Sequence, residues 1–259
     1  MKTVILCGGQ GTRLREETEY RPKPLVEVGG RPILWHILKT YSHYGHRDFV
    51  LCLGYRGNMI KDYFLSYEAM TNDFTICLGA QHAIQYHGAH NEQDFHVTLA
   101  DTGMNAMTGS RVKQIERYIG DDDTFMVTYG DGIADIDIGA LLDFHRSHDR
   151  IATVTSVRPI SRYGLLDFDT RQQVLRFAEK PNDDGWISAG YFVFNRRVFD
   201  YLSDDPATVL ERGPLERLTQ EGQLMAFRHE GFFFAMDTYR EYLYLNELWD
   251  SGQAPWKVW

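Results

Sequence analysis

The stretch Lys2–Pro24, KTVILCGGQGTRLREETEYRPKP, decides the fold predicted for this 259-residue chain. Its first part, Thr3–Cys7, is a short apolar run rich in β-branched residues, which is typical of a buried strand. Glycines follow this run directly. Because glycine has no side chain, the backbone can bend sharply there and approach a ligand closely. The loop continues with a threonine hydroxyl and an arginine, and a lysine follows that stands between two prolines. The loop residues concerned are Gly8, Gly9, Gly11, Thr12, Arg13 and Lys23.

A strand that leads into such a loop can hold a polyphosphate, first through backbone amides and then through the fixed cations. Two familiar phosphate loops are excluded. No Gly-Lys-Ser/Thr closes the segment as in a Walker loop, and Leu14 stands where a dinucleotide fingerprint needs its third glycine. An ordinary glycine turn remains the alternative explanation of the loop by itself.

Composition narrows the class of protein. Hydrophobic residues make up 43% and charged residues 24% of the chain, as in a soluble globular protein. The formal net charge of −9 argues against nucleic acid or an anionic membrane as a partner. The absence of a long apolar run predicts a cytoplasmic protein. Cys7, Cys52 and Cys77 lack metal-ligand spacing and are expected to be buried thiols.

Strand and helix patterns alternate after the glycine loop. Apolar residues recur at helical spacing over Arg31–Tyr41, Asp48–Leu53 is a second apolar run, and Met59–Tyr67 carries another helical face. This order predicts a Rossmann-like α/β fold with a mixed, mostly parallel sheet flanked by helices. Ligands of such sheets bind at the carboxyl ends of the strands, where the glycine loop falls.

The segment from about 70 to 103 breaks this alternation and is predicted to be a small β-rich insert. Phe74–Leu78 and Phe95–Leu99 resemble strands, and the polar connection between them contains three histidines, His82, His87 and His90. These histidines lack the spacing of a metal site. A flexible loop or a hairpin used in subunit contact is the preferred interpretation.

Two further loops carry polar groups. Asp101–Arg111 is rich in small residues and opens a helix, so that Thr108 and Arg111 could offer a hydroxyl and a cation to an anion or a base edge. Thr124–Tyr129 is a third buried strand, and Gly130-Asp131-Gly132 follows it, which leaves the Asp131 carboxylate uncrowded. Magnesium commonly takes one or two protein carboxylates and completes its shell with phosphate and water oxygens. A capped helix start and an Asp-Gly turn are the simpler alternatives.

The second half of the chain, from Ile151, is richer in strands and contains two more candidate sites. Glu179 and Lys180 precede a proline and suit sugar hydroxyls and a phosphate, with a surface ion pair as the alternative. Asp237 follows an aromatic run and is either a second metal ligand or the N-cap of a helix over Tyr239–Trp249. No nucleophile triad or zinc cluster is evident, which favours attack of an anionic substrate oxygen on a nucleotide phosphorus without covalent catalysis.

Several motifs together resemble the signature of the sugar-1-phosphate nucleotidylyltransferase family, and within it the cytidylyltransferase group. The similarity runs nearly from end to end. The motifs are Gly8–Leu14, Glu16–Thr18, Pro22–Pro24, Gly29–Leu34, Ile33–His36, Asp101–Gly103, Met107–Arg111, Thr128–Gly132, Met236–Thr238 and Ala254–Lys257.

The resemblance implies one nucleotidyltransferase domain over residues 1–259, of the nucleotide-diphospho-sugar transferase type, with a nucleotide-binding half (1–150) and a sugar-phosphate-binding half (151–259). It also implies transfer from CTP to α-D-glucose 1-phosphate with Mg²⁺, giving CDP-glucose and pyrophosphate, in a homo-oligomer that is expected to be a hexamer. The implied catalytic residues are Arg13, Lys23 and Asp131, and the implied metal ligands are Asp131 and Asp237. The implied nucleotide-binding residues are Leu6, Cys7, Gly8, Gly9, Gly11, Thr12, Arg13, Lys23, Thr108, Arg111 and Gly130. The implied sugar-phosphate-binding residues are Tyr163, Gly164, Glu179, Lys180 and Ser188.

The chain departs from the family pattern at Cys7, Ser110, Ala235 and Ser188-Ala189, the last pair replacing an expected Asn-Gly. Loss of one buried hydrogen-bond partner costs on the order of 1–3 kcal/mol, enough to alter sugar preference. Three alternatives therefore stay open: another nucleotide such as dTTP or UTP, another sugar 1-phosphate or a phosphonate, and a catalytically silent nucleotide-sugar-binding regulator. A nicotinamide oxidoreductase is a distant fourth.

Overall fold

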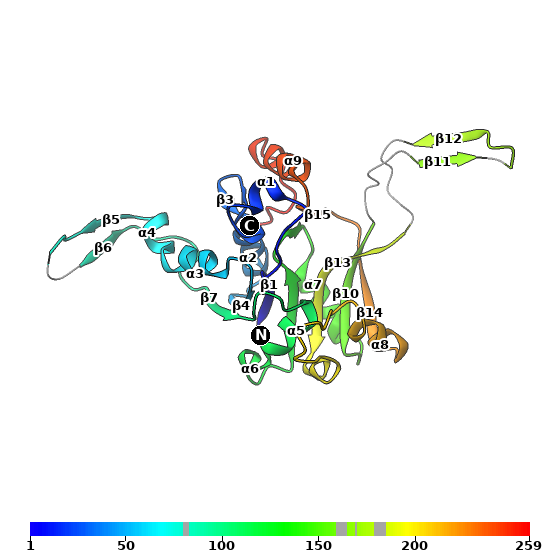
Figure 1. The fold of residues 1–259 in the computed structure, drawn as a ribbon, viewed down its shortest axis with the longest axis horizontal. Coiled ribbons are helices and arrows are strands. Elements are labelled where there is room, and N and C mark those ends of the chain that lie inside the picture. Colours follow the sequence, from blue (N-terminus) through cyan, green and yellow to red (C-terminus); the bar gives the residue numbers. More distant parts are fainter. Residues whose placement is uncertain (80–82, 159–164, 169, 179–184) are drawn as a thin grey trace.

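A seven-stranded sheet forms the centre of the computed structural model, which describes residues 1–79, 83–158, 165–168, 170–178 and 185–259 (Figure 1). The strand order is β14-β10-β13-β8-β1-β4-β7. All neighbouring strands are parallel except β13, which runs antiparallel to β10 and β8. The predicted mixed, mostly parallel sheet is confirmed. The strands are β1 (Thr3–Leu6), β4 (Asp48–Leu53), β7 (His96–Asp101), β8 (Thr124–Tyr129), β10 (Ala152–Val157), β13 (Ile187–Asn195) and β14 (Leu224–His229).

Two apolar cores cover the two faces of this sheet. Successive side chains of a strand point to opposite faces, so Ile5 lies in one core while Val4 and Leu6 lie in the other. The first core is covered by α2 (Ile33–His43), α7 (Ile138–Arg146) and α9 (Tyr239–Asp250). The second is covered by α5 (Thr108–Gln114), α6 (Glu116–Ile119), α8 (Pro214–Gln220) and the 3-10 helix η2 (Arg196–Tyr201). The helices predicted on both faces are therefore present.

Shorter elements surround the sheet. They are the helices α1 (Arg15–Thr18), η1 (Lys23–Leu25), α3 (Gly57–Leu65) and α4 (Tyr67–Thr71), and the strand pairs β2 (Glu27–Val28) with β3 (Arg31–Pro32), β5 (Asp73–Ile76) with β6 (Ile84–His87), β9 (Gly132–Ala134) with β15 (Phe233–Ala235), and β11 (Leu165–Phe168) with β12 (Val174–Ala178). Among the described helices, none is long and apolar enough to cross a bilayer.

The segment predicted as an insert divides into two parts. Its second expected strand is β7, which pairs with β4 and forms the edge of the main sheet. The projecting part is the β5–β6 hairpin, which extends from the body in Figure 1. The strand β6 was not predicted, because Ile84–His87 lies in the polar, histidine-rich connection. Cys77 was expected to be buried, but it is exposed beside this hairpin, whereas Cys7 and Cys52 are buried.

The C-terminal tail docks on the chain's own core. Trp256 is fully buried, and its indole N–H donates to His36 Nδ1 at 3.3 Å. Because an indole only donates, His36 must carry its proton on Nε2, which lies 2.8 Å from the Val28 carbonyl oxygen. Burial lowers the pKa of His36 to about 4, so this ring is neutral at physiological pH. The tail thereby fixes α2 against the β2–β3 pair.

Candidate active site

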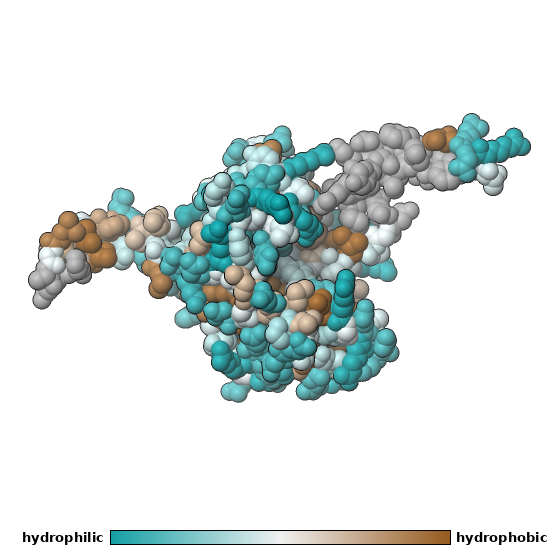
Figure 2. Space-filling model, viewed as in Figure 1, coloured by the Kyte–Doolittle hydropathy of each residue, from teal (hydrophilic) through white to brown (hydrophobic). Residues whose placement is uncertain are grey.

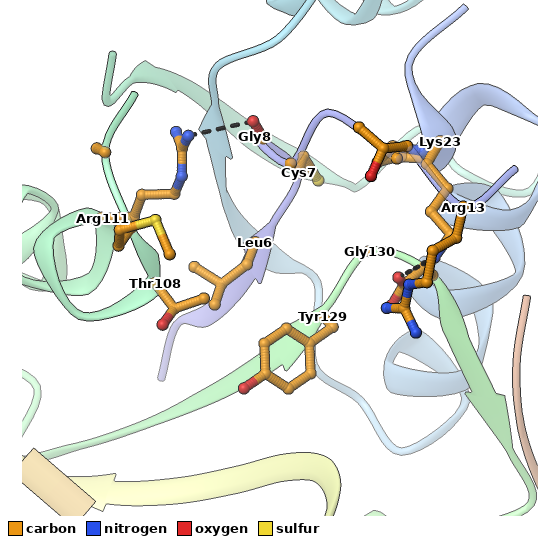
Figure 3. Close-up of a pocket in the computed structure, with 16 residues that line it drawn as sticks. Leu6, Cys7, Gly8, Arg13, Lys23, Thr108, Arg111, Tyr129 and Gly130 are labelled. Atoms are coloured by element: carbon orange, nitrogen blue, oxygen red, sulfur yellow. Dashed lines mark hydrogen bonds and ion pairs between the residues drawn. The ribbon is translucent and has the colours of Figure 1, made fainter. Parts of the chain in front are cut away.

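The glycine loop begins at the carboxyl end of β1, in the middle of the sheet. Leu6 pairs with Cys52 of β4 on one side and with Tyr129 of β8 on the other, so the loops after these three strands meet. The loops after β1 and β8, together with residues 106–111 that follow β7, surround a pocket that Figure 3 shows in close-up. The pocket is lined by Leu6, Cys7, Gly8, Gly9, Gly11, Thr12, Arg13, Lys23, Pro24, Ala106, Met107, Thr108, Arg111, Tyr129, Gly130 and Asp131.

All of the residues assigned to the nucleotide by the resemblance line this pocket, and Asp131 lines it with them. Pro24, Ala106, Met107 and Tyr129 also line it, although no binding role was predicted for them. Tyr129 had a usable signal, because it ends a predicted strand immediately before Gly130-Asp131. The pocket's place agrees with the rule that ligands of parallel sheets bind at the strands' carboxyl ends.

Lys23 links the pocket to two aspartates that are distant in sequence. It lies in η1 between Pro22 and Pro24, and its side chain is only 10% exposed. Its Nζ donates to Asp131 Oδ2 at 2.6 Å and to Asp237 Oδ1 at 2.7 Å. Burial lowers the pKa of the Lys23 ammonium, but the two carboxylates outweigh burial, and the net shift is upward. Lys23 is therefore held as a cation between two anions.

Asp237 receives a second cation. Arg13 Nη1 donates to Asp237 Oδ2 at 2.7 Å, and the Arg13 side chain is otherwise mostly exposed. The alternative that Asp237 is the N-cap of α9 is wrong. Thr238 occupies that position, with its hydroxyl accepting from Glu241 N and the Glu241 carboxylate accepting from Thr238 N in a capping box. The Asp237 side chain is thus directed to the basic residues of the pocket.

The Asp131 and Asp237 carboxylates fit a magnesium site. They converge on one nitrogen, that of Lys23, so both can reach a single positive charge. Within the described residues, no group of three or more histidine, cysteine, aspartate or glutamate side chains is placed to hold a metal. Two carboxylates with room for phosphate and water oxygens is the donor set that Mg²⁺ prefers, whereas zinc commonly takes histidine and cysteine.

Arg111 is buried beneath the glycine loop. One terminal nitrogen donates to the Leu53 carbonyl at 2.9 Å and to Thr102 Oγ1 at 2.7 Å. The other donates to the Gly8 carbonyl at 3.1 Å and to the Met104 carbonyl at 3.4 Å. Burial lowers the pKa of this guanidinium. Since β1, β4 and β7 end at these acceptors, Arg111 fastens three strand ends together.

Two glycines make room for that guanidinium. A Cβ atom at Gly8 would lie 2.2 Å from Arg111 Cζ, and one at Gly54 would lie 2.7 Å from both terminal nitrogens. Gly8 is therefore needed for packing against Arg111 as well as for access to a ligand. A direct contact of Arg111 with the nucleotide stays a prediction, whereas its contacts with the loop backbone are present in the structure.

Two polar side chains, Thr108 and Tyr129, form the wall of the pocket away from Lys23, and both contact Glu211, which is not itself a lining residue. Figure 3 shows the Tyr129 hydroxyl pointing toward Thr108. Both hydroxyls donate to Glu211, from Thr108 Oγ1 to Oε2 at 2.7 Å and from the Tyr129 hydroxyl to Oε1. Burial first, and then Glu211, raise the pKa of the Tyr129 phenol. No local sequence signal identified Glu211, because it lies in an irregular segment 103 positions from Thr108.

The predicted sugar-phosphate residues are only partly placed. Tyr163, Gly164, Glu179 and Lys180 lie outside the described residues. Ser188 lies in β13, is exposed, and its hydroxyl accepts from Gly190 N at 3.2 Å. Their roles toward the sugar remain predictions.

Comparison with known proteins identifies the family to which this pocket belongs. Residues 2–226 match the family described as nucleotidyl transferase. The chain belongs to the nucleotidyl transferase family. It is 50% identical over 260 residues to the glucose-1-phosphate cytidylyltransferase of Salmonella typhi, and the match covers 100% of both chains. It is 31% identical over 260 residues to the mannose-1-phosphate guanyltransferase of Saccharomyces cerevisiae, covering 96% of this chain and 66% of that one.

A solved structure agrees with the nucleotidyl transferase fold. The crystal structure of HddC from Yersinia pseudotuberculosis complexed with GMP-PN superposes with a TM-score of 0.67 at 23% identity, covering 96% of this chain and 99% of that chain. At this identity the likeness concerns the fold. The resemblance read from the motifs and the prediction of a nucleotidyltransferase are confirmed.

Proposed function

We propose that this nucleotidyl transferase joins CTP and α-D-glucose 1-phosphate to give CDP-glucose and pyrophosphate. The full-length similarity to the Salmonella typhi glucose-1-phosphate cytidylyltransferase supports the substrate pair. The observation that carries the chemistry is the convergence of Lys23, Asp131 and Asp237 beside the glycine loop. A protein that only binds a nucleotide sugar has no need of two carboxylates from separate strands around one buried lysine.

The proposed reaction needs no protein nucleophile. A phosphate monoester has its second pKa near ~6, so glucose 1-phosphate is already mostly a dianion at neutral pH. One of its oxygens attacks the α-phosphorus of CTP in line, forming a new P–O bond as the bond to the β-phosphate breaks. Pyrophosphate leaves with the electron pair of that bond. The protein's task is to hold two mutually repelling polyanions together.

Residues of the pocket are suited to that task. The amides of the loop that contains Gly8 and Gly9 can bind the triphosphate, and Arg13 can move from Asp237 to a phosphate because it is mostly exposed. Lys23 places a fixed positive charge where the α-phosphate and the leaving group develop negative charge. Mg²⁺, held by Asp131 and Asp237, would supply further neutralisation of the phosphates and orient them.

The choice of sugar is expected to depend on Ser188. Ser188 replaces the asparagine expected there, and its hydroxyl already accepts from Gly190 N. We propose that residues 151–259 bind the sugar phosphate and residues 1–150 the nucleotide within one catalytic domain.

The three free cysteines accord with a reducing compartment, which supports a cytoplasmic location.

The test is pyrophosphate release over a grid of substrates. Purified protein is incubated with CTP, UTP, dTTP, GTP or ATP and with glucose 1-phosphate, other hexose 1-phosphates or a phosphonate, with and without Mg²⁺. We expect the highest kcat/KM with CTP and glucose 1-phosphate, and no turnover when the metal is chelated. Preference for dTTP would overturn the nucleotide assignment, and turnover with no pair would favour a silent binding protein.

We also propose that the protein is a homo-oligomer in which the β5–β6 hairpin contacts a neighbouring copy. Figure 2 shows apolar side chains gathered on this projecting hairpin. Leu78 is 83% exposed, and Phe74, Ile76, Ile84 and Tyr86 are also exposed. Such a patch on a thin projection usually marks an interaction surface. Phe74→Lys with Ile84→Lys should lower the mass measured by light scattering, whereas unchanged mass would exclude the hairpin as the contact.

A further inference from the structure

The Thr108 hydroxyl has two hydrogen-bond partners in the protein, and they use its proton and one of its lone pairs. A hydroxyl has one proton to donate and two lone pairs that accept. Its proton goes to Glu211 Oε2 at 2.7 Å, because an ionised carboxylate can only accept. One lone pair accepts from Leu210 N at 2.9 Å. What Thr108 can still offer to a ligand is a single acceptor.

The proton of the Tyr129 hydroxyl is also used in a hydrogen bond to Glu211. This hydroxyl donates to the other oxygen of Glu211, so the one carboxylate receives protons from both hydroxyls. The Tyr129 ring is itself held in place, because a Cβ atom at Gly190 would lie 2.1 Å from its Cδ2. Thr108 and Tyr129 both line the pocket. The wall formed by these two residues therefore presents hydrogen-bond acceptors.

We propose that Glu211 is a positioning residue that makes this wall accept hydrogen bonds and thereby selects cytosine over uracil. The inference rests on the proposed function, since it names how that site recognises its base. Cytosine carries an amino donor at position 4, where uracil and thymine carry a carbonyl acceptor. An acceptor on the protein pairs with the amino group, whereas it faces the carbonyl without a proton between them. The base is placed on this wall because Lys23, Arg13 and Asp131 lie on the opposite side of the pocket, where they are proposed to bind the phosphates and the magnesium ion.

Glutamine at position 211 tests this arrangement with little change in shape. Its side-chain amide has one accepting oxygen and one donating nitrogen, so it can receive a proton from only one of the two hydroxyls. The other hydroxyl must turn its proton elsewhere and can then donate to a ligand carbonyl. We expect Glu211→Gln to lower the CTP-over-UTP ratio of kcat/KM by about tenfold, mainly through a gain with UTP. Glu211→Ala, which frees both hydroxyls, should lower the ratio at least as far.

A matched pair elsewhere in the chain supplies the control. Tyr201 donates to Glu221 at the end of α8, outside the pocket, so Glu221→Gln disturbs a similar tyrosine–glutamate pair without touching the base wall. This variant should keep the wild-type ratio. Tyr129→Phe and Thr108→Val separate the two hydroxyls, and the larger fall in the ratio identifies the one that reads the base.

The outcomes separate the two proposals. If the wild-type protein does not prefer CTP to UTP, the proposed function is wrong at the nucleotide. If the wild type prefers CTP and both Glu211 variants keep that preference while folding normally by circular dichroism, the role of Glu211 is overturned. A Glu211 variant that loses CTP and UTP turnover equally would show a structural role without base selection, which also overturns it.

Discussion

Asp237→Asn is expected to remove nearly all turnover and to leave the fold intact. Asparagine has the same shape but brings no negative charge to Lys23, Arg13 or a magnesium ion. Loss of one preorganised electrostatic group in an active site costs about 10²–10³-fold in kcat. The measurement is pyrophosphate release across a magnesium titration, together with thermal unfolding of the same preparation.

Thr238→Ala, at the neighbouring position, is expected to lower stability and to leave turnover intact, which is the opposite of the result expected for Asp237→Asn. Thr238 caps α9, whereas Asp237 is the residue that accepts the hydrogen bonds of Lys23 and Arg13. Its loss should cost about 1 kcal/mol of stability, as for other N-caps, and leave kcat close to the wild-type value. An Asp237→Asn protein with full magnesium-dependent turnover would show that this carboxylate only neutralises Lys23 and Arg13.

The fold was largely predictable because local pattern and tertiary position agree in the parallel part of the sheet. Apolar β-branched runs marked β1, β4 and β8, and helical spacing marked α2, so the position of the glycine loop at the sheet's carboxyl edge followed. β6 was missed because it is only four residues long and lies in a polar, histidine-rich connection, where an alternation of apolar and polar residues as short as Ile84–His87 does not stand out.

The closeness of two site residues could be predicted from strand order only where both residues follow strand ends. Gly8 and Asp131 come after adjacent parallel strands, so their closeness could be inferred from sequence alone. Whether Asp237 or Thr238 caps α9 could not, because both residue types are good caps at adjacent positions. The Glu211 contacts depend on how an irregular segment packs on the wall, and Arg111 reaches backbone carbonyls that no sequence pattern records.

Arg111→Met is expected to destabilise the protein and to weaken nucleotide binding at the same time. Methionine fills part of the space between Gly8 and Gly54 but donates no hydrogen bonds to the three strand ends. The Gly8 carbonyl keeps one other donor, Tyr55 N, and the Leu53 carbonyl keeps two, Thr102 N and the Thr102 hydroxyl. We therefore expect a loss of about 3 kcal/mol in the free energy of unfolding, within the range for a few lost charge-assisted bonds. Urea unfolding followed by tryptophan fluorescence measures it.

The same variant separates two roles of the Arg111 guanidinium. If it fastens the glycine loop, stability and the KM for nucleotide change together, and Arg111→Lys does not restore either, because a single ammonium cannot span acceptors on three strands. If it acts on the nucleotide alone, Arg111→Met keeps wild-type stability while KM rises. Arg117→Met is the matched control, since Arg117 lies on α6, is exposed and stacks on Tyr118. That replacement should change neither quantity, so a shared loss in the Arg111 variant reports on the buried contacts with Gly8 and Leu53.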